Sequence, residues 1–253
     1  MSPAGAPGLL DVRIAKKRVA NAAGRPVEIL SNFAFRLEAG EVGALIGPSG
    51  CGKSTCMRIV AGLDLAFEGT VQRPSGQLGM VFQEPRLLPW RNVEDNIRLA
   101  APHVTEAELE ALLTPLGLAE HRAHYPGELS LGLARRVALA RAFAVAPSLL
   151  LLDEPFVSLD APLARALEGE LGALIAERSV TTVLITHDLG EAIRLADRIF
   201  VLSPRPAGVL GEIRIESPRI RIGAAEARSI ERRVEALWAT AKEAPEPSGT
   251  ADA

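Results

Sequence analysis

A glycine-rich loop at residues 47–55 constrains the fold of this chain more than any other stretch. Its sequence, Gly47-Pro48-Ser49-Gly50-Cys51-Gly52-Lys53-Ser54-Thr55, fits the phosphate-binding pattern G-x-x-x-x-G-K-[ST]. The apolar segment 42–46 before it is short enough for a buried strand, and residues 55–61 after it are interpreted as a helix. Strand, loop and helix in this order are the context in which the pattern binds phosphate.

The residue types of the loop suit this chemistry. Glycines at 47, 50 and 52 let consecutive backbone N–H groups point at phosphate oxygens, and the following helix adds the positive end of its dipole. Lys53 can then reach the β- and γ-phosphates, and the Ser54 hydroxyl can ligate Mg²⁺. The alternative is a glycine-rich turn that only connects a strand to a helix. The complete motif in its expected context argues against that alternative.

Composition limits the class of protein. The chain has 253 residues, 48% of them hydrophobic, and a net charge of −3, so it can bury a large core and has no overall attraction for nucleic acid. We expect no secretory signal in residues 1–10, and no stretch reaches the roughly 20 apolar residues that cross a bilayer. Cys51 and Cys56 lack partners for a metal or disulfide, which favours a reduced cytosolic compartment.

The first 37 residues predict two half-exposed strands. Residues 10–14 and 27–37 alternate apolar and polar side chains, and residues 21–26 between them form a turn pattern. The basic residues 16–18 are interpreted as the solvated end of a strand. No aromatic residue occurs before Phe33.

The middle of the chain changes from strand to helix. Residues 79–82 predict a buried strand that ends at Gln83, and the proline-rich residues 84–92 predict an exposed, irregular connector. The pattern between about 93 and 145 is helical, and it includes a Thr-x-x-Glu capping sequence at Thr105. A helical insertion therefore separates two sheet-forming halves.

The second half alternates strands with helices. Strands are predicted at 149–152, 181–186 and 199–202, and helices at about 161–177 and 188–196. This alternation predicts an α/β fold with a mainly parallel, helix-flanked sheet. Beyond Pro218 the pattern is charged and helical until about residue 242, and residues 243–253 are predicted to be disordered.

Two carboxylates follow the strand at 149–152. Asp153 lies at the carboxyl end of the sheet, where it can hold Mg²⁺ through the water shell of the ion, and Glu154 could polarise an attacking water. Taken alone, the segment could be a strand that ends in solvent-facing acids. The phosphate loop in the same chain makes the functional interpretation the stronger one.

These segments resemble the nucleotide-binding subunit of ABC transporters over residues 9–218. Six motifs carry the resemblance: Gly47–Thr55 is similar to Walker A, Gln83 to the glutamine loop, Leu129-Ser130-Leu131-Gly132-Leu133 to the ABC signature, Leu149–Glu154 to Walker B, Ser158-Leu159-Asp160 to the D-loop, and His187 to the switch histidine. His103, His121 and His124 lack such a context and are interpreted as surface residues.

The resemblance implies an α/β P-loop NTPase fold: a mainly parallel sheet, an antiparallel β subdomain and an inserted helical subdomain at about 93–145. Beyond the region of resemblance, the charged, helical pattern predicts a C-terminal helical extension at 219–242. Expected catalytic residues are Glu154, His187, Lys53 and Gln83, and expected Mg²⁺ ligands are Ser54, Gln83 and Asp153. Expected ATP-binding residues are Gly47, Ser49, Gly50, Cys51, Gly52, Lys53, Ser54, Thr55, Ser130, Gly132, Asp160 and Val19.

Residues 81–90 and 202–206 resemble the nitrate/sulfonate/taurine-type importers within that family. This resemblance implies a second copy of the chain that closes over ATP, an integral membrane permease that meets the connector, and, indirectly, an extracytoplasmic solute-binding protein. It implies a peripheral position on the cytoplasmic face of the membrane and a small anionic or sulfonate-like solute. No nucleic-acid partner is expected.

Three residues depart from the family pattern. Val19 stands where an aromatic residue usually stacks on adenine, Leu131 replaces a signature glycine, and Leu133 replaces a polar signature residue. They leave open a nucleotide-gated regulatory module with little hydrolysis, although the intact Glu154 and His187 argue against it. A soluble ABC ATPase acting on DNA or ribosomes is the other alternative, but such proteins usually carry a long coiled coil or two ATPase domains.

Overall fold

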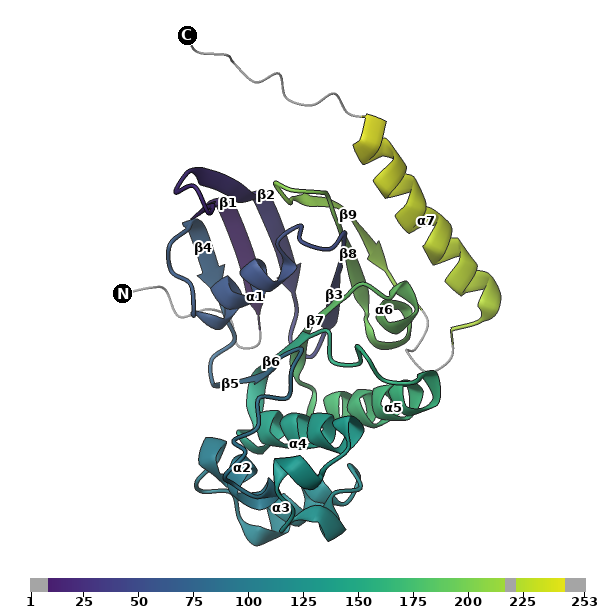
Figure 1. Cartoon of the computed structure of the whole chain (residues 1–253). Coiled ribbons are helices and arrows are strands. Elements are labelled where there is room, and N and C mark those ends of the chain that lie inside the picture. Colours follow the sequence, from purple (N-terminus) through teal and green to yellow (C-terminus); the bar gives the residue numbers. More distant parts are fainter. Residues whose placement is uncertain (1–8, 217–221, 244–253) are drawn as a thin grey trace.

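The computed structural model describes residues 9–216 and 222–243 (Figure 1). Its main sheet has six strands in the order β5-β6-β7-β3-β8-β9. The pairings are parallel except for β8 with β9, which confirms the predicted mainly parallel sheet. The strands are β3 (Val42–Ile46), β5 (Gln77–Val81), β6 (Pro147–Asp153), β7 (Thr181–Thr186), β8 (Arg198–Leu202) and β9 (Val209–Arg214).

The central strands are apolar throughout because both faces of the sheet are buried. Successive β6 residues alternate between two hydrophobic clusters: Leu150 and Leu152 pack with the helices on one face, and Leu149 and Leu151 face the antiparallel sheet and α1 (Lys53–Ala61). In Figure 1, α1 lies between the two sheets. The edge strand β9 was not predicted, because its residues are only partly buried.

The second sheet is antiparallel, with the order β2-β1-β4. It contains β1 (Leu10–Ala20), β2 (Pro26–Leu37) and β4 (Glu68–Gln72), so β1 is longer than predicted and β4 was missed. The predicted turn at 21–26 is present, and the Asn21 side chain accepts hydrogen bonds from the Ala23 and Arg25 amides at 2.9 Å.

The expectation of a solvated strand end at residues 16–18 is wrong for Lys17. Its side chain is buried, and Nζ donates to Asp64 Oδ1 at 2.7 Å and to the Ala66 carbonyl at 2.8 Å. Lys17 therefore anchors the loop after α1 to the antiparallel sheet.

The remaining helices are α2 (Val93–Ala100), α3 (Glu106–Leu113), α4 (Leu131–Ala144), α5 (Ala161–Arg178), α6 (Leu189–Leu195) and α7 (Ala224–Glu243), with short 3₁₀ turns at Ala119–His121 and Pro126–Glu128. Figure 1 shows α2, α3 and α4 gathered at the β5–β6 end of the molecule, and α7 along the β8–β9 side. No helix in the described ranges is long and apolar enough to cross a bilayer.

The domain boundaries remain predictions. The predicted units are the ATPase domain at 9–218, the extension at 219–242 and the tail at 243–253. Their boundaries depend on residues 217–221 and 244–253, which lie outside the described residues. Helix α7 covers most of the predicted extension.

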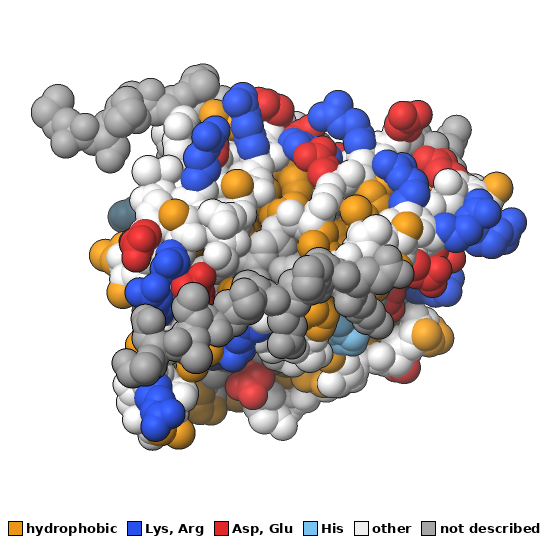
Figure 2. Space-filling model, turned by 90° about the horizontal axis from the view of Figure 1, so that it is seen from above, with side chains coloured by type: hydrophobic (Ala, Val, Ile, Leu, Met, Phe, Trp, Pro, Cys, Tyr) orange, Lys and Arg blue, Asp and Glu red, His pale blue; other side chains and the backbone are white. Residues whose placement is uncertain are grey.

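The top face of the molecule carries charges of both signs. Figure 2 shows basic and acidic side chains interspersed there, with hydrophobic side chains visible between them. On the antiparallel sheet, Arg13 pairs with Asp11 within β1, and Arg36 of β2 pairs with Glu38 just beyond that strand.

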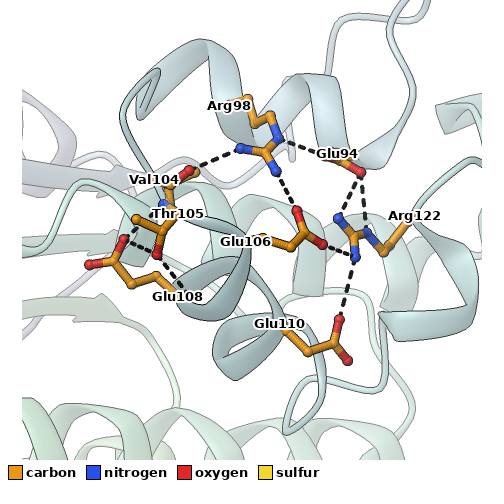
Figure 3. A network of polar contacts seen from close by, with 8 residues as sticks. All are labelled: Glu94, Arg98, Val104, Thr105, Glu106, Glu108, Glu110 and Arg122. Atoms are coloured by element: carbon orange, nitrogen blue, oxygen red, sulfur yellow. Dashed lines mark hydrogen bonds and ion pairs between the residues drawn. The ribbon is translucent and has the colours of Figure 1, made fainter.

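Two arginines hold the helical region together (Figure 3). Arg98 contacts Glu94 at 2.6 Å and Glu106 at 2.7 Å, and Arg122 contacts Glu94 at 3.0 Å and Glu106 at 2.5 Å. The predicted capping box is present at the start of α3, where Thr105 and Glu108 bond reciprocally. The network links α2, α3 and the segment before α4.

Because of this network, we expect the folded protein to lose stability at acid pH. The hydrogen bond from Arg98, with those from Arg122, lowers the pKa of Glu94, and the Arg122 hydrogen bond lowers the pKa of Glu106. The stabilisation is therefore full above the ordinary carboxyl pKa of about 4.3 and is lost as the pH falls through the lower folded pKa values.

We expect R122M to lower the Tm at neutral pH by about 2–4 °C and to reduce the Tm difference between pH 6 and pH 3, since its carboxylate partners lose a cation. Thermal unfolding across this pH range measures both effects. R13M, which removes an exposed ion pair on β1, is the control. Parallel pH profiles for wild type and R122M would show that the network has no such role.

Candidate nucleotide site

Three neighbouring parallel strands deliver most of the predicted site to one edge of the sheet. Strand β3 leads into the phosphate loop, β6 ends at Asp153 and continues to Glu154, and β7 leads to His187. In the order β6-β7-β3 these strands are adjacent, so their carboxyl ends lie together. Open α/β sheets bind ligands at this edge.

The phosphate loop requires its glycines. Gly52 has φ +132°, and a Cβ there would lie 2.8 Å from Leu30 Cδ2; a Cβ on Gly47 would lie 2.9 Å from Leu202 Cβ. Gly50 also has a positive φ, of +74°. The loop therefore packs against β2 and β8 while it leads into the N-terminus of α1, which favours an anion.

Lys53 begins α1 and points back into the loop. Its buried Nζ donates to the Gly47 carbonyl at 2.7 Å and to the Pro48 carbonyl at 3.0 Å. The ammonium is thus held inside the curve of the loop, where phosphate oxygens would enter. Ser49, Cys51 and Thr55 occupy the remaining predicted loop positions, with Cys51 buried.

Ser54 and Asp153 form a pair of hard oxygen donors suited to Mg²⁺. Their Oγ and Oδ1 atoms lie 3.4 Å apart. Burial raises the pKa of Asp153, opposed by the hydrogen bond from Ser54. The described residues contain no group of three His, Cys, Asp or Glu side chains able to hold a metal, so an ion here would take further ligands from phosphate and water. The residues present fit Mg²⁺ bound in that way.

Glu154 and His187 lie side by side, with Oε1 and Nδ1 3.4 Å apart. Glu154 has φ +47°, a conformation that costs a non-glycine residue about 1 kcal/mol, and its amide donates to the Ile185 carbonyl at 2.9 Å. Beside His187, the Asp188 amide donates to Thr186 Oγ1 at 2.9 Å. The ends of β6 and β7 therefore fix the relative placement of these two side chains.

Gln83 follows β5, next to β6, and is exposed. The connector at 84–92 is irregular as predicted, and its Trp90 is 69% exposed. Two side chains that the sequence did not single out hold it: Arg141 of α4 donates to the Pro85 and Arg86 carbonyls at 2.8 and 2.9 Å, and buried Asn96 of α2 accepts from the Leu88 amide at 2.8 Å.

The signature and D-loop residues occupy helix starts. Ser130 Oγ accepts from the Leu133 amide at the start of α4, and Asp160 Oδ1 accepts from the Leu163 amide at the start of α5. A Cβ on Gly132 would lie 2.7 Å from Leu163 Cδ2. Helix capping explains Ser130 and Asp160, and close packing explains Gly132. Within the described chain, no hydrogen bond joins these residues to the phosphate loop.

The two altered signature positions differ in surroundings. Leu131 is 44% exposed at the start of α4, whereas Leu133 packs against the hydrophobic core. Leu131 is therefore the more exposed of the two side chains, and Leu133 is partly buried.

Val19 lies near the end of β1, opposite Val27 of β2, and is 39% exposed. It offers no ring for an adenine base.

We expect V19Y to raise ATP affinity by about 10- to 100-fold, since aromatic stacking of a base contributes roughly 1–3 kcal/mol. V19I, which adds bulk without a ring, is the control. Equilibrium titration with ATP and GTP measures both the affinity and the adenine preference. Strict adenine preference at micromolar affinity in the wild-type chain would contradict this account.

The structure adds two residues beside the phosphate loop. The Trp238 indole N–H of α7 donates to the Leu202 carbonyl at 3.1 Å, and Trp238 lines a pocket of about 350 Å³ with Gly47–Ser49, His187 and Pro204. Arg205 donates to the Gly50 carbonyl. Nothing in the local sequence indicates these contacts, because their partners are far apart in the chain.

Comparisons with known proteins agree with this geometry. The family model described as ABC transporter matches residues 30–157. The chain is 42% identical over 225 residues to an aliphatic sulfonates import ATP-binding protein, SsuB 2, of Burkholderia cenocepacia (strain HI2424), covering 85% of this chain and 82% of that protein. It is 44% identical over 202 residues to SsuB 1 of Rhodococcus jostii (strain RHA1), covering 78% of this chain and 81% of that protein.

Two solved structures of the ATP-binding cassette MJ0796 are also similar. One, a dimeric structure of this bacterial ABC transporter cassette, has a TM-score of 0.72 at 26% identity. The other is a dimer in a post-hydrolysis state with ADP and Pi, with a TM-score of 0.70 at 27% identity. Each comparison covers 83% of this chain and all of the other. The fold, the six motifs in order and these similarities show that the chain belongs to the ABC transporter family.

Proposed function

We propose that this chain binds and hydrolyses ATP to power an importer for a small sulfonate-like anion. One observation carries the proposal: the sheet edge beside the phosphate loop brings Ser54 to Asp153 and Glu154 to His187. These are the groups needed to hold Mg²⁺ and to place a water against a phosphate. The names of the relatives supply the class of solute.

Each residue of the site has a role in phosphoryl transfer to water. Lys53 and the loop amides stabilise charge on the β- and γ-phosphates, Glu154 orients the attacking water and accepts its proton, and His187 contacts the γ-phosphate. Ser54, Asp153 and Gln83 would hold Mg²⁺, which supplies charge neutralisation at the phosphates. Because Glu154 lies 3.4 Å from His187, one water-sized position can be shared by both side chains.

A second copy of the chain would complete the site. In the proposed pair, Ser130 and Gly132 of one copy face the phosphate loop of the other. Asp160 of the D-loop lies beside the same interface. The dimeric cassettes with similar folds support this arrangement. The exposed Leu131 would then lie at the interface, where it sets how closely the two copies approach.

The connector at 84–92 would receive an integral membrane permease, which places the chain at the cytoplasmic face of the membrane. Trp90 offers an exposed aromatic surface, while Arg141 and Asn96 hold the connector beside Gln83. Indirectly, an extracytoplasmic binding protein would deliver the solute.

Reconstitution tests this proposal. Vesicles containing the chain with its permease and binding protein should accumulate an alkanesulfonate only with ATP on the side of this chain. Uptake without ATP hydrolysis, or hydrolysis with uptake of other solutes only, would contradict the proposed transport role.

A further inference from the structure

A buried arginine of the signature helix contacts the turn that carries Glu154. Arg135 lies one turn into α4 and is only 5% exposed. Its Nη1 donates to the Pro155 carbonyl at 2.6 Å and approaches the Glu154 carbonyl at 3.4 Å, and its Nη2 donates to the Val157 carbonyl. One guanidinium thus binds three carbonyls within four residues.

Burying the charged guanidinium of Arg135 costs free energy, which its hydrogen bonds to the turn must offset. Burial lowers the pKa of Arg135, partly offset by Glu191, and its Nε is buried with no hydrogen-bond partner. A guanidinium nevertheless stays protonated, and its planar fork matches several acceptors at once. Hydrogen bonds from a charged donor are roughly twice as strong as neutral ones.

The turn it contacts has an unusual backbone. Glu154 has φ +47° and Ser158 has φ +63°, both in the left-handed region. Within the turn, the Val157 amide donates to the Glu154 carbonyl at 3.3 Å and the Leu159 amide to the Phe156 carbonyl at 3.2 Å. These internal bonds are accepted by the carbonyls of residues 154 and 156, whereas the carbonyls of residues 155 and 157 accept from Arg135.

We propose that Arg135 is a positioning residue that holds Glu154 in place and ties it to the signature helix of the same copy. Figure 1 shows α4 beside α5, and the turn at 154–160 leads from β6 to α5. Ser130 and Gly132, which would face the ATP of the second copy, lie at the start of α4, so a shift of α4 on pairing moves the guanidinium and the turn together. This inference rests on the proposed function.

The test compares R135M, which keeps bulk but removes all donors, with R135K, which keeps the charge. We expect R135M to lower kcat by about 10- to 100-fold, as misplacement of a reacting group by an ångström does, while the KM for ATP stays within about twofold. R135K should recover part of the loss. The control is R136M: Arg136 is the next residue of α4, but it contacts the Leu116 carbonyl and Glu170, each at 2.9 Å.

A second readout needs no hydrolysis. The Val157 and Leu159 amides should exchange hydrogen at least about tenfold faster in R135M than in wild type, and no faster in R136M. If R135M does not fold, kcat and amide exchange are measured on R135K instead and compared with R136M. Unchanged kcat and unchanged amide exchange would overturn the inference. If E154Q hydrolyses ATP like wild type, the proposed function fails instead, which separates the two outcomes.

Discussion

Replacing Glu154 with glutamine should lower the rate of ATP hydrolysis by about 10²–10⁴-fold, the usual contribution of a general base. Glutamine keeps the shape of the side chain and its place beside His187 but cannot accept a proton from water. Phosphate release at saturating ATP measures the loss.

The same variant should trap the ATP-bound pair. Lys53, the loop amides and Ser54 are unchanged, so ATP still closes the two copies, and the hydrolysis that reopens them is blocked. Size-exclusion chromatography with ATP and Mg²⁺ should show a stable dimer for E154Q and a transient one for wild type. E120Q, at an exposed glutamate of the helical region, is the matched control. Rapid hydrolysis by E154Q would refute the role of Glu154.

Local sequence was sufficient for the parts of the site that one segment builds. The phosphate loop, Asp153 and Glu154 follow from a motif and from the end of a strand, and the capping chemistry at Thr105 depends only on nearby residues. Gln83 and His187 came from the family resemblance, since neither residue has a local pattern of its own. Their roles stay predictions.

The contacts between distant segments could not be predicted in this way. Arg135 and its carbonyl partners are about 20 residues apart, Arg141 lies 56 residues from Pro85, and Trp238 lies 36 residues from Leu202. Lys17 was misjudged for the same reason. A run of basic residues suggests that all three side chains are exposed to solvent. Side chains alternate between the two faces of a strand, however, so Lys17 points toward Asp64, which lies in the loop after α1.

Lys53 and Ser130 should each be essential, but in different copies. K53M removes charge-assisted contacts to the phosphates, each contributing about 1.5–3 kcal/mol, so we expect ATP affinity to fall by at least about 100-fold. K16M, at a lysine in a surface ion pair on β1, is its control. S130D keeps the side-chain cap of α4, because aspartate caps helices as well as serine. It also places a carboxylate where the γ-phosphate of the other copy would lie. Each variant alone should therefore lack hydrolysis while remaining folded.

The most direct measurement mixes these two inactive chains and follows ATP hydrolysis. In a mixed pair, one site combines Lys53 of the S130D chain with Ser130 of the K53M chain, and is intact. With equal amounts and random pairing, activity should return to at most about a quarter of wild type, since half of the pairs are mixed and each has one intact site. No recovered activity, or full activity of the S130D chain alone, would contradict the claim that each ATP site is built from two copies.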